Sequence, residues 1–133
     1  MIFEVLGNPM GKQRARTLRN GHSYTPEKTV NYETLIKLSC PKLSAPLVGA
    51  LNLSIIAYYP IPKSFSKTKR EQALQGHIRP LVKPDIDNVI KIVCDALNGI
   101  AYKDDTQIST VWATKKYGEQ PKIIIQITED TIT

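Results

Sequence analysis

An apolar stripe with helical spacing is the feature of this sequence that most constrains its fold. Apolar side chains recur between residues 86 and 97 at positions i, i+3, i+4, i+7 and i+11, so they share one face of an α-helix. They are Ile86, Val89, Ile90, Val93 and Leu97. Asn98-Gly99 is a suitable end for this helix. The stripe predicts a helix that packs against another apolar layer.

A second pattern, with a period of two, predicts a strand over 50–59 that Pro60 closes. The apolar residues on its buried face are Leu51, Leu53, Ile55 and Ala57. Further strands are expected at 2–6, 106–117 and 122–128, the last two joined by a hairpin-like turn at 118–121.

Two more helices flank the strand at 50–59. The first has Thr25 as its N-cap, Pro26 in its first turn and 28–40 as its body. Its expected buried positions are Val30, Leu35 and Leu38. The second is a short polar helix over 66–74, capped by Ser64 or Ser66.

The predicted element order is β-α-β-α-α-β-β. One right-handed crossover and a terminal hairpin imply a mixed α/β (α+β) sheet with helices packed on it. The 133 residues suit a single domain. Residues 8–25 contain Pro9, Gly11 and Gly21 without apolar periodicity, which predicts a basic arm in place of a helix or strand.

Composition excludes several classes of protein. Apolar residues make up 41% and charged residues 23% of the chain, which is typical of a soluble globular protein and not of a disordered one. No apolar run is long enough to span a membrane. Glu4 stands where a signal peptide would carry cations. Two cysteines do not suggest a disulfide framework. We therefore expect a cytoplasmic protein.

The charge is unevenly distributed along the chain. The formal net charge is +6, yet residues 12–83 carry 13 Lys or Arg against three acids, whereas residues 84–133 carry five Lys against eight acids. The basic part suits a polyphosphate partner. The acidic part would repel that partner unless a cation lay between them. This contrast points to a metal-dependent enzyme that acts on nucleic acid.

The acidic part centres on the helix at 86–97. Asp85 and Asp87 bracket Ile86 at its start, where Asp87 is a natural N-cap and the helix dipole favours ionised carboxylates. Lys91 and Asp95 follow Asp87 at intervals of four residues on one polar face. Asp95 lies about 12 Å along the axis from Asp87, too far to share one metal directly. Each feature also has a structural reading, as a cap or a surface pair.

Asp104 and Asp105 follow the helix and open the next strand, near whichever helix end the packing dictates. Hydrolysis of a phosphodiester requires stabilised phosphate charge and an activated water, which Mg²⁺ held by carboxylates supplies. Aspartates without a His or Cys cluster fit Mg²⁺ or Mn²⁺ better than Zn²⁺. Lys91 would stabilise the transition-state phosphate or orient the water.

These motifs together resemble the RusA family of Holliday-junction resolvases, found largely in phages and prophages. The core motifs are Lys83-Pro84-Asp85-Ile86-Asp87-Asn88, Lys91, Asp95-Ala96-Leu97-Asn98-Gly99 and Asp104-Asp105-Thr106-Gln107-Ile108. The arm resembles that of many members over Gly7-Asn8-Pro9-Met10-Gly11-Lys12-Gln13-Arg14-Ala15-Arg16 and Tyr24-Thr25-Pro26. Arg14-Ala15-Arg16 departs from the family's second arginine-proline pairing, which leaves the contacts of the arm open.

The resemblance implies a homodimeric α/β endonuclease that uses Mg²⁺, with Mn²⁺ as a substitute, to nick opposed strands of a four-way DNA junction. By position, Asp85, Asp87 and Asp105 match the metal-binding aspartates and Lys91 the catalytic lysine. Asp104 would support them, and Asp95 would orient the helix or bond Lys91. The expected DNA-binding residues are Lys12, Arg14, Arg16, Lys67, Lys69, Arg70, Arg79 and Lys83.

Two alternatives remain at this stage. One is a non-catalytic junction-binding protein that kept the fold. The other is a less selective Mg²⁺-dependent nuclease acting on branched DNA. The carboxylates argue against the first, because a pure DNA-binding protein gains nothing from acids that face phosphate. The sequence does not separate the second from junction resolution.

Overall fold

The structure, a computed structural model, describes residues 1–13, 16–24 and 26–130. Its centre is a four-stranded sheet with the strand order β1-β6-β4-β5. The strands are β1 (Ile2–Leu6), β4 (Leu51–Pro60), β5 (Ile108–Gly118) and β6 (Lys122–Glu129). The helices are α1 (Glu27–Ser39), α2 (Lys67–Leu74) and α3 (Ile86–Leu97). The expected mixed sheet flanked by helices is therefore confirmed.

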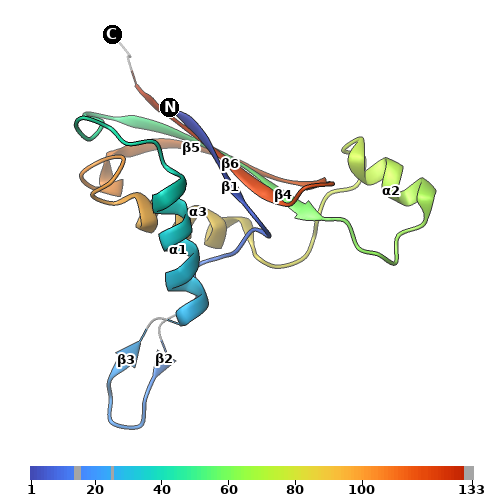
Figure 1. The fold of residues 1–133 in the computed structure, drawn as a ribbon, viewed down its shortest axis with the longest axis horizontal. Helices are drawn as coiled ribbons and strands as arrows, with labels where there is room; N and C mark the ends of the chain where they lie inside the picture. The colour runs from blue at the N-terminus through green and yellow to red at the C-terminus, as the bar shows by residue number, and fades with distance from the viewer. Residues whose placement is uncertain (14–15, 25, 131–133) are drawn as a thin grey trace.

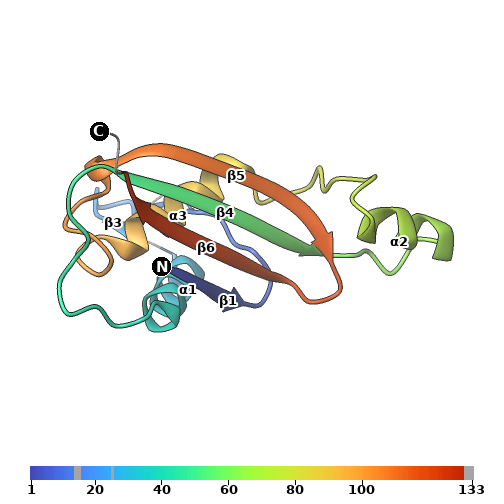
Figure 2. The same ribbon diagram turned by 90° about the horizontal axis from the view of Figure 1, so that it is seen from above.

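The helices α1 and α3 pack on the same face of the sheet, and α2 projects from one end of the molecule (Figure 1). Figure 2 shows the opposite face of the sheet, with the strands in front of α1 and α3. The buried residues of β4 alternate as predicted, and Leu51, Leu53, Ile55 and Ala57 are all in the core. Within the described residues, no helix is long and apolar enough to span a membrane.

The predicted terminal hairpin is wrong. β6 lies between β1 and β4 and is antiparallel to both, whereas β5 runs parallel to β4 at the sheet edge. The two strands at 108–118 and 122–129 are thus separated by β4. Burial explains this order: Ile123, Ile125 and Ile127 of β6 are in the core, so β6 takes a central position. Only Tyr117 of β5 is buried, which suits an edge strand.

The expected buried face of α1 is also wrong. Val30, Leu35 and Leu38 are exposed, whereas Thr29, Tyr32 and Ile36 are buried. Tyr32 and Ile36 are one turn apart, and the helix turns this face toward α3 and β1. Pro26 is the N-cap residue, and the expected cap, Thr25, lies outside the described residues.

The apolar stripe of α3 is confirmed from Val89 to the last residue of the helix. Val89, Val93 and Leu97 are fully buried, Ile86 and Ile90 are half-buried, and the sequence interpretation missed the buried Ile92 and Ala96. The N-cap residue is Asp85, not Asp87. Asp85 follows Pro84 in an extended conformation, so the helix starts one residue after it and Asp87 falls in the first turn.

The arm contains a small hairpin, β2 (Arg16–Thr17) paired with β3 (Ser23–Tyr24), which the sequence interpretation left as a loop. A one-turn 3₁₀ helix, η1 (Asp105–Gln107), precedes β5. α2 is capped by Ser66, whose hydroxyl accepts from the Lys69 amide at 3.2 Å. The choice between the two expected caps is thereby resolved in favour of Ser66.

Candidate nuclease site

The N-terminal end of α3 presents two carboxylates to solvent. Asp85 is the N-cap residue and Asp87 lies in the first turn, and both side chains are exposed. The Asp85 carbonyl accepts from the Val89 amide at 3.1 Å, the first bond of the helix. Two hard oxygen donors are therefore available at this end of the helix.

Lys91 lies one turn after Asp87 and is exposed. The structure gives its ammonium no hydrogen bond or ion pair among the described residues. Asp95, the next polar residue on this face, has its Oδ2 atom 3.4 Å from Lys12 Nζ. The expected alternative role of Asp95 as a partner of Lys91 is thus not seen, and Lys91 faces solvent.

Asp105 lies at the opposite end of α3. Its backbone amide donates to Asn98 Oδ1 at 2.8 Å, and Asn98 is the C-cap residue of the helix. Asp104 caps η1, with reciprocal hydrogen bonds to Gln107 that form a capping box. Partial burial, followed by the hydrogen bond and charge of Asp104 and the charge of Asp95, raises the pKa of Asp105. Three aspartates thus meet at the C-terminal end of α3.

One chain does not gather the three expected metal ligands. The 12 residues of α3 separate Asp85 from the Asn98–Asp105 end by about 18 Å. Within the described residues, no group of three His, Cys, Asp or Glu side chains is arranged to hold a metal ion. The donor chemistry fits a hard cation, but a single chain supplies it in two separate places.

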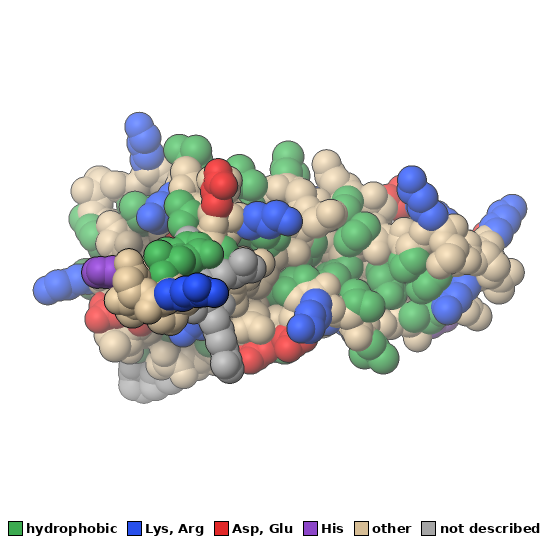
Figure 3. All heavy atoms as spheres, turned by 90° about the horizontal axis from the view of Figure 1, so that it is seen from below, with side chains coloured by type: hydrophobic (Ala, Val, Ile, Leu, Met, Phe, Trp, Pro, Cys, Tyr) green, Lys and Arg blue, Asp and Glu red, His purple; other side chains and the backbone are tan. Residues whose placement is uncertain are grey.

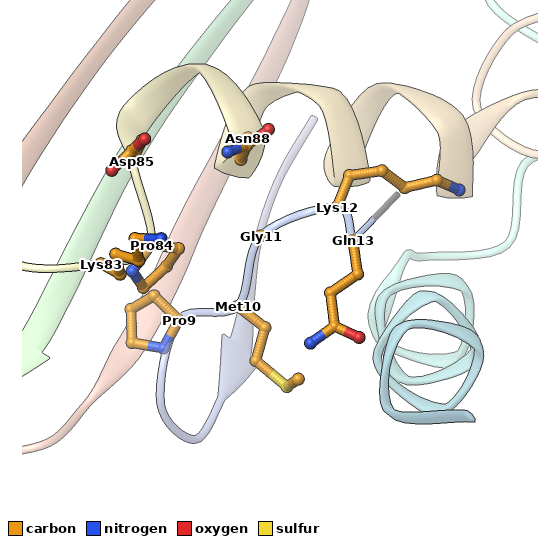
Figure 4. Close-up of a pocket in the computed structure, with 9 residues that line it drawn as sticks. All are labelled: Pro9, Met10, Gly11, Lys12, Gln13, Lys83, Pro84, Asp85 and Asn88. Carbon is orange, nitrogen blue, oxygen red and sulfur yellow. The ribbon is translucent and has the colours of Figure 1, made fainter. Parts of the chain in front are cut away.

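A hollow of about 420 Å³ lies beside Asp85, between the arm and the start of α3 (Figure 4). Its lining comes from the arm and from the segment that leads into the helix. The residues are Pro9, Met10, Gly11, Lys12, Gln13, Lys83, Pro84, Asp85 and Asn88. The Lys12 amide donates to the Asn88 carbonyl at 3.0 Å, which fixes the arm to α3 at this point.

A family model described as endodeoxyribonuclease RusA matches residues 7–128 of this chain, which include the arm, the start of α3 and Asp105. The chain belongs to the RusA family. A relative from Bacillus subtilis (strain 168), named uncharacterized protein YqaN, is 37% identical over 134 residues, covering 96% of this chain and 94% of the relative. RusA proteins are endodeoxyribonucleases that act on Holliday junctions, so nuclease activity is supported for this chain.

Lys12 has a structural role in this RusA-family chain that its sequence position did not suggest. Its ammonium bonds Glu33 of α1 and also contacts Asp95 of α3. Burial lowers the pKa of Lys12, but the hydrogen bond and charge of Glu33, together with Asp95, raise it overall. Lys12 therefore links the arm to two helices, and its positive charge is largely balanced within the molecule.

The other expected DNA-binding residues lie in separate regions. Arg14 and the side chain of Arg16 lie outside the described part of the chain. Lys67, Lys69 and Arg70 lie on α2, where Lys69 Nζ is 4.3 Å from the centre of the Phe65 ring. Figure 3 shows Lys and Arg side chains spread over the helix-bearing face instead of gathered in one patch. A DNA partner that contacts them all must extend along the molecule.

Three residues near the site escaped the sequence interpretation. Gly11 approaches Asn88 so closely that an added Cβ would lie 2.8 Å from Asn88 Cβ. Tyr59 donates from its hydroxyl to the Pro84 carbonyl. Burial, with the nearby charge of Asp85, raises the pKa of Tyr59 to about 12. Asn88 and Gly11 did stand in family motifs of the sequence, at the end of Asp85-Ile86-Asp87-Asn88 and within the arm, whereas Tyr59 carried no signal.

Proposed function

We propose that this RusA-family protein is a homodimeric, divalent-metal-dependent endonuclease that nicks opposed strands of a four-way DNA junction. The observation that carries the proposal is the exposure of Asp85, Asp87 and Lys91 at the N-cap and in the first two turns of α3, in a chain whose family cleaves DNA. These are the residue types that phosphodiester hydrolysis requires, and no hydrogen bond or ion pair with another described residue occupies the Lys91 ammonium.

Asp85, Asp87 and Asp105 are the proposed ligands of Mg²⁺ or Mn²⁺. When bound, such an ion neutralises phosphate charge and lowers the pKa of a bound water. Lys91 supplies positive charge next to the phosphate in the transition state. Asp104 holds Asp105 in place through the cap of η1. Lys83 and the cations of α2, which are Lys67, Lys69 and Arg70, bind the DNA backbone on either side.

The separation of Asp105 from the other two proposed ligands suggests that a dimer is needed to complete the metal site. Because α3 keeps them about 18 Å apart in one chain, we infer that Asp85 and Asp87 of one copy meet Asp105 of a second. A two-fold dimer would then hold two such shared sites, one for each strand to be nicked. A monomer would bind the metal weakly, since it offers only two of the three carboxylates.

Mixing two inactive variants tests the shared site. Asp85→Asn and Asp105→Asn should each abolish nicking of a synthetic junction, because each removes a ligand from both sites of its dimer. In a mixed dimer, one site carries both substitutions and the other is intact. Equal mixing should therefore restore about a quarter of the wild-type sites, with nicks in one strand of each junction. Mixing Asp85→Asn with Asp87→Asn is the matched control and should stay inactive.

The outcomes separate the alternatives. No restoration, although differently tagged subunits exchange, would refute the shared site. Tight junction binding without nicking in Mg²⁺ or Mn²⁺ would make the protein a junction-binding module. Equal nicking of forks, flaps and junctions would make it a less selective nuclease. Isothermal titration of wild type and Asp85→Asn with Mn²⁺ gives a readout independent of cleavage and should show binding only for wild type.

A further inference from the structure

Leu81 and Val82 form an apolar tip on the segment that joins α2 to α3. Leu81 is 90% exposed, more than any other large apolar side chain in the described residues, and Val82 is 57% exposed. The two residues precede Asp85 by four and three positions. An exposed apolar pair beside a proposed catalytic centre needs a physical reason, because water solvates it poorly.

The segment that carries the tip is fixed to the sheet at both ends. Arg79 Nη1 donates to Thr114 Oγ1 at 2.8 Å and to the Lys115 carbonyl at 3.0 Å. Lys115 Nζ donates to the Val82 carbonyl at 2.6 Å. Pro80, between these anchors, is buried. The backbone is therefore held against β5 while the Leu81 side chain points into solvent.

The residues that flank the tip in the sequence line two hollows. Arg79, Pro80 and Ile86, with Thr114 and Lys115 of β5, line one of about 310 Å³. Lys83, Pro84 and Asp85 line part of the other, of about 420 Å³. Cations thus line both hollows, Arg79 and Lys115 in one and Lys83 in the other.

We propose that Leu81, supported by Val82, inserts between bases at the branch point of the junction and unstacks them beside the scissile phosphate. This inference rests on the proposed function. Arg79, Lys83 and Lys115 attract phosphates around the tip, whereas an apolar side chain gains nothing from a phosphate backbone. Apolar side chains that enter a base step are a known means of kinking DNA. The centre of a junction is where stacking is already interrupted.

A second copy of the chain is the competing partner for the tip. The charge around it favours DNA, because the cores of protein–protein interfaces are depleted of charged residues. Arg79 and Lys83, each two residues from Leu81, and Lys115, which donates to the Val82 carbonyl, would have to be buried or paired in such an interface. Nucleic acid satisfies both the cations and the apolar tip at once.

Fluorescence of 2-aminopurine at the branch point tests the proposal directly. With EDTA present to prevent cleavage, wild type should raise the fluorescence of the probe at one position next to the branch. Leu81→Asn should lose more than about half of this rise and should slow junction cleavage in Mg²⁺ about tenfold. Leu38→Asn, at a 78% exposed leucine of α1, is the matched control and should behave as wild type.

A junction with mismatched bases at its centre should restore cleavage by Leu81→Asn, whereas a variant that is inactive because it is misfolded would not be restored. Because mismatched bases cost less to unstack, the cleavage defect of Leu81→Asn should shrink to within about twofold on this substrate. Cleavage without any fluorescence rise at any probe position would overturn the inference and leave the proposed function standing. A change of oligomeric state in Leu81→Asn would instead assign the tip to the subunit interface. No junction cleavage by wild type would refute the proposed function itself.

Discussion

Replacing Gly11 with alanine adds one methyl group where the arm crosses the start of α3. The new Cβ would lie 2.8 Å from Asn88 Cβ and 3.0 Å from Pro84 Cβ, and neither atom belongs to the far end of a flexible side chain. Relief of this overlap requires the arm to move away from α3, which breaks the 3.0 Å bond from the Lys12 amide to the Asn88 carbonyl.

Two contributions set the free-energy cost of Gly11→Ala. Overpacking of this kind costs about 1–3 kcal/mol, and loss of a backbone hydrogen bond costs about 0.5–1.5 kcal/mol. Gly11→Ala should therefore destabilise the docked arm by about 2–4 kcal/mol. Urea denaturation measures how much of this destabilisation lowers the global free energy of unfolding. Limited proteolysis of the arm measures how often the arm detaches from α3 while the rest of the protein stays folded.

A double-mutant cycle with Asn88→Gly isolates the overlap. Removing Asn88 Cβ eliminates the 2.8 Å contact and leaves the 3.0 Å contact with Pro84 Cβ. Gly11→Ala should then cost about 1 kcal/mol less in the Asn88→Gly background than in wild type. Strict additivity of the two substitutions, or an arm equally protected from protease in Gly11→Ala, would refute the close packing of the arm on α3.

Other predictions concern stability. Ile36→Ala should lower the free energy of unfolding by about 2–5 kcal/mol because Ile36 is fully buried, whereas Leu38→Ala on the same helix should change it by less than about 0.5 kcal/mol; urea titration of both variants checks this. Asp104→Ala, which removes the cap of η1, should cost about 1 kcal/mol in the same assay. Burial raises the pKa of the Cys40 thiol, so the thiol of the unfolded chain loses its proton at a lower pH than the thiol of the folded chain. The free energy of unfolding should therefore fall as pH rises above the ordinary thiol pKa, and it should fall less in Cys40→Ala. Equal pH dependence of the two proteins would contradict that assignment.

The sequence predicted the parts of the fold that a single pattern determines. The alternation in β4 has only one apolar face, so burial follows from it directly. α1 offers two candidate faces, since Leu35 and Leu38 compete with Tyr32 and Ile36. The choice depends on the surface that α3 and β1 present, which no local pattern contains. The position of β6 likewise depends on which strand pairs with the free edge of β4, and a single strand's pattern does not determine this.

The candidate site also has residues whose placement follows from local spacing and residues whose placement depends on tertiary contacts. Asp87 and Lys91 are four residues apart on α3, so their common face follows from spacing alone, and Asp85 is the N-cap residue of the same helix. The location of Asp105 depends on the Asn98 side chain, which binds its amide and keeps it at the far end of α3. Lys12 was expected to bind DNA because it lies in the basic arm, and its ion-pair partners, Glu33 and Asp95, are too distant in sequence to have been noticed. Whether a cation is free for a phosphate is a tertiary property.

The central position of β6 has a consequence during synthesis. Of the four strands of this sheet, β6 is the last to leave the ribosome, yet it separates β1 from β4 and pairs with both. Until it emerges, the nascent chain has no continuous sheet on which α1 and α3 can pack. The helix α3, whose N-cap is Asp85 and which carries Asp87 and Lys91, is therefore fully supported only after β6 has been made.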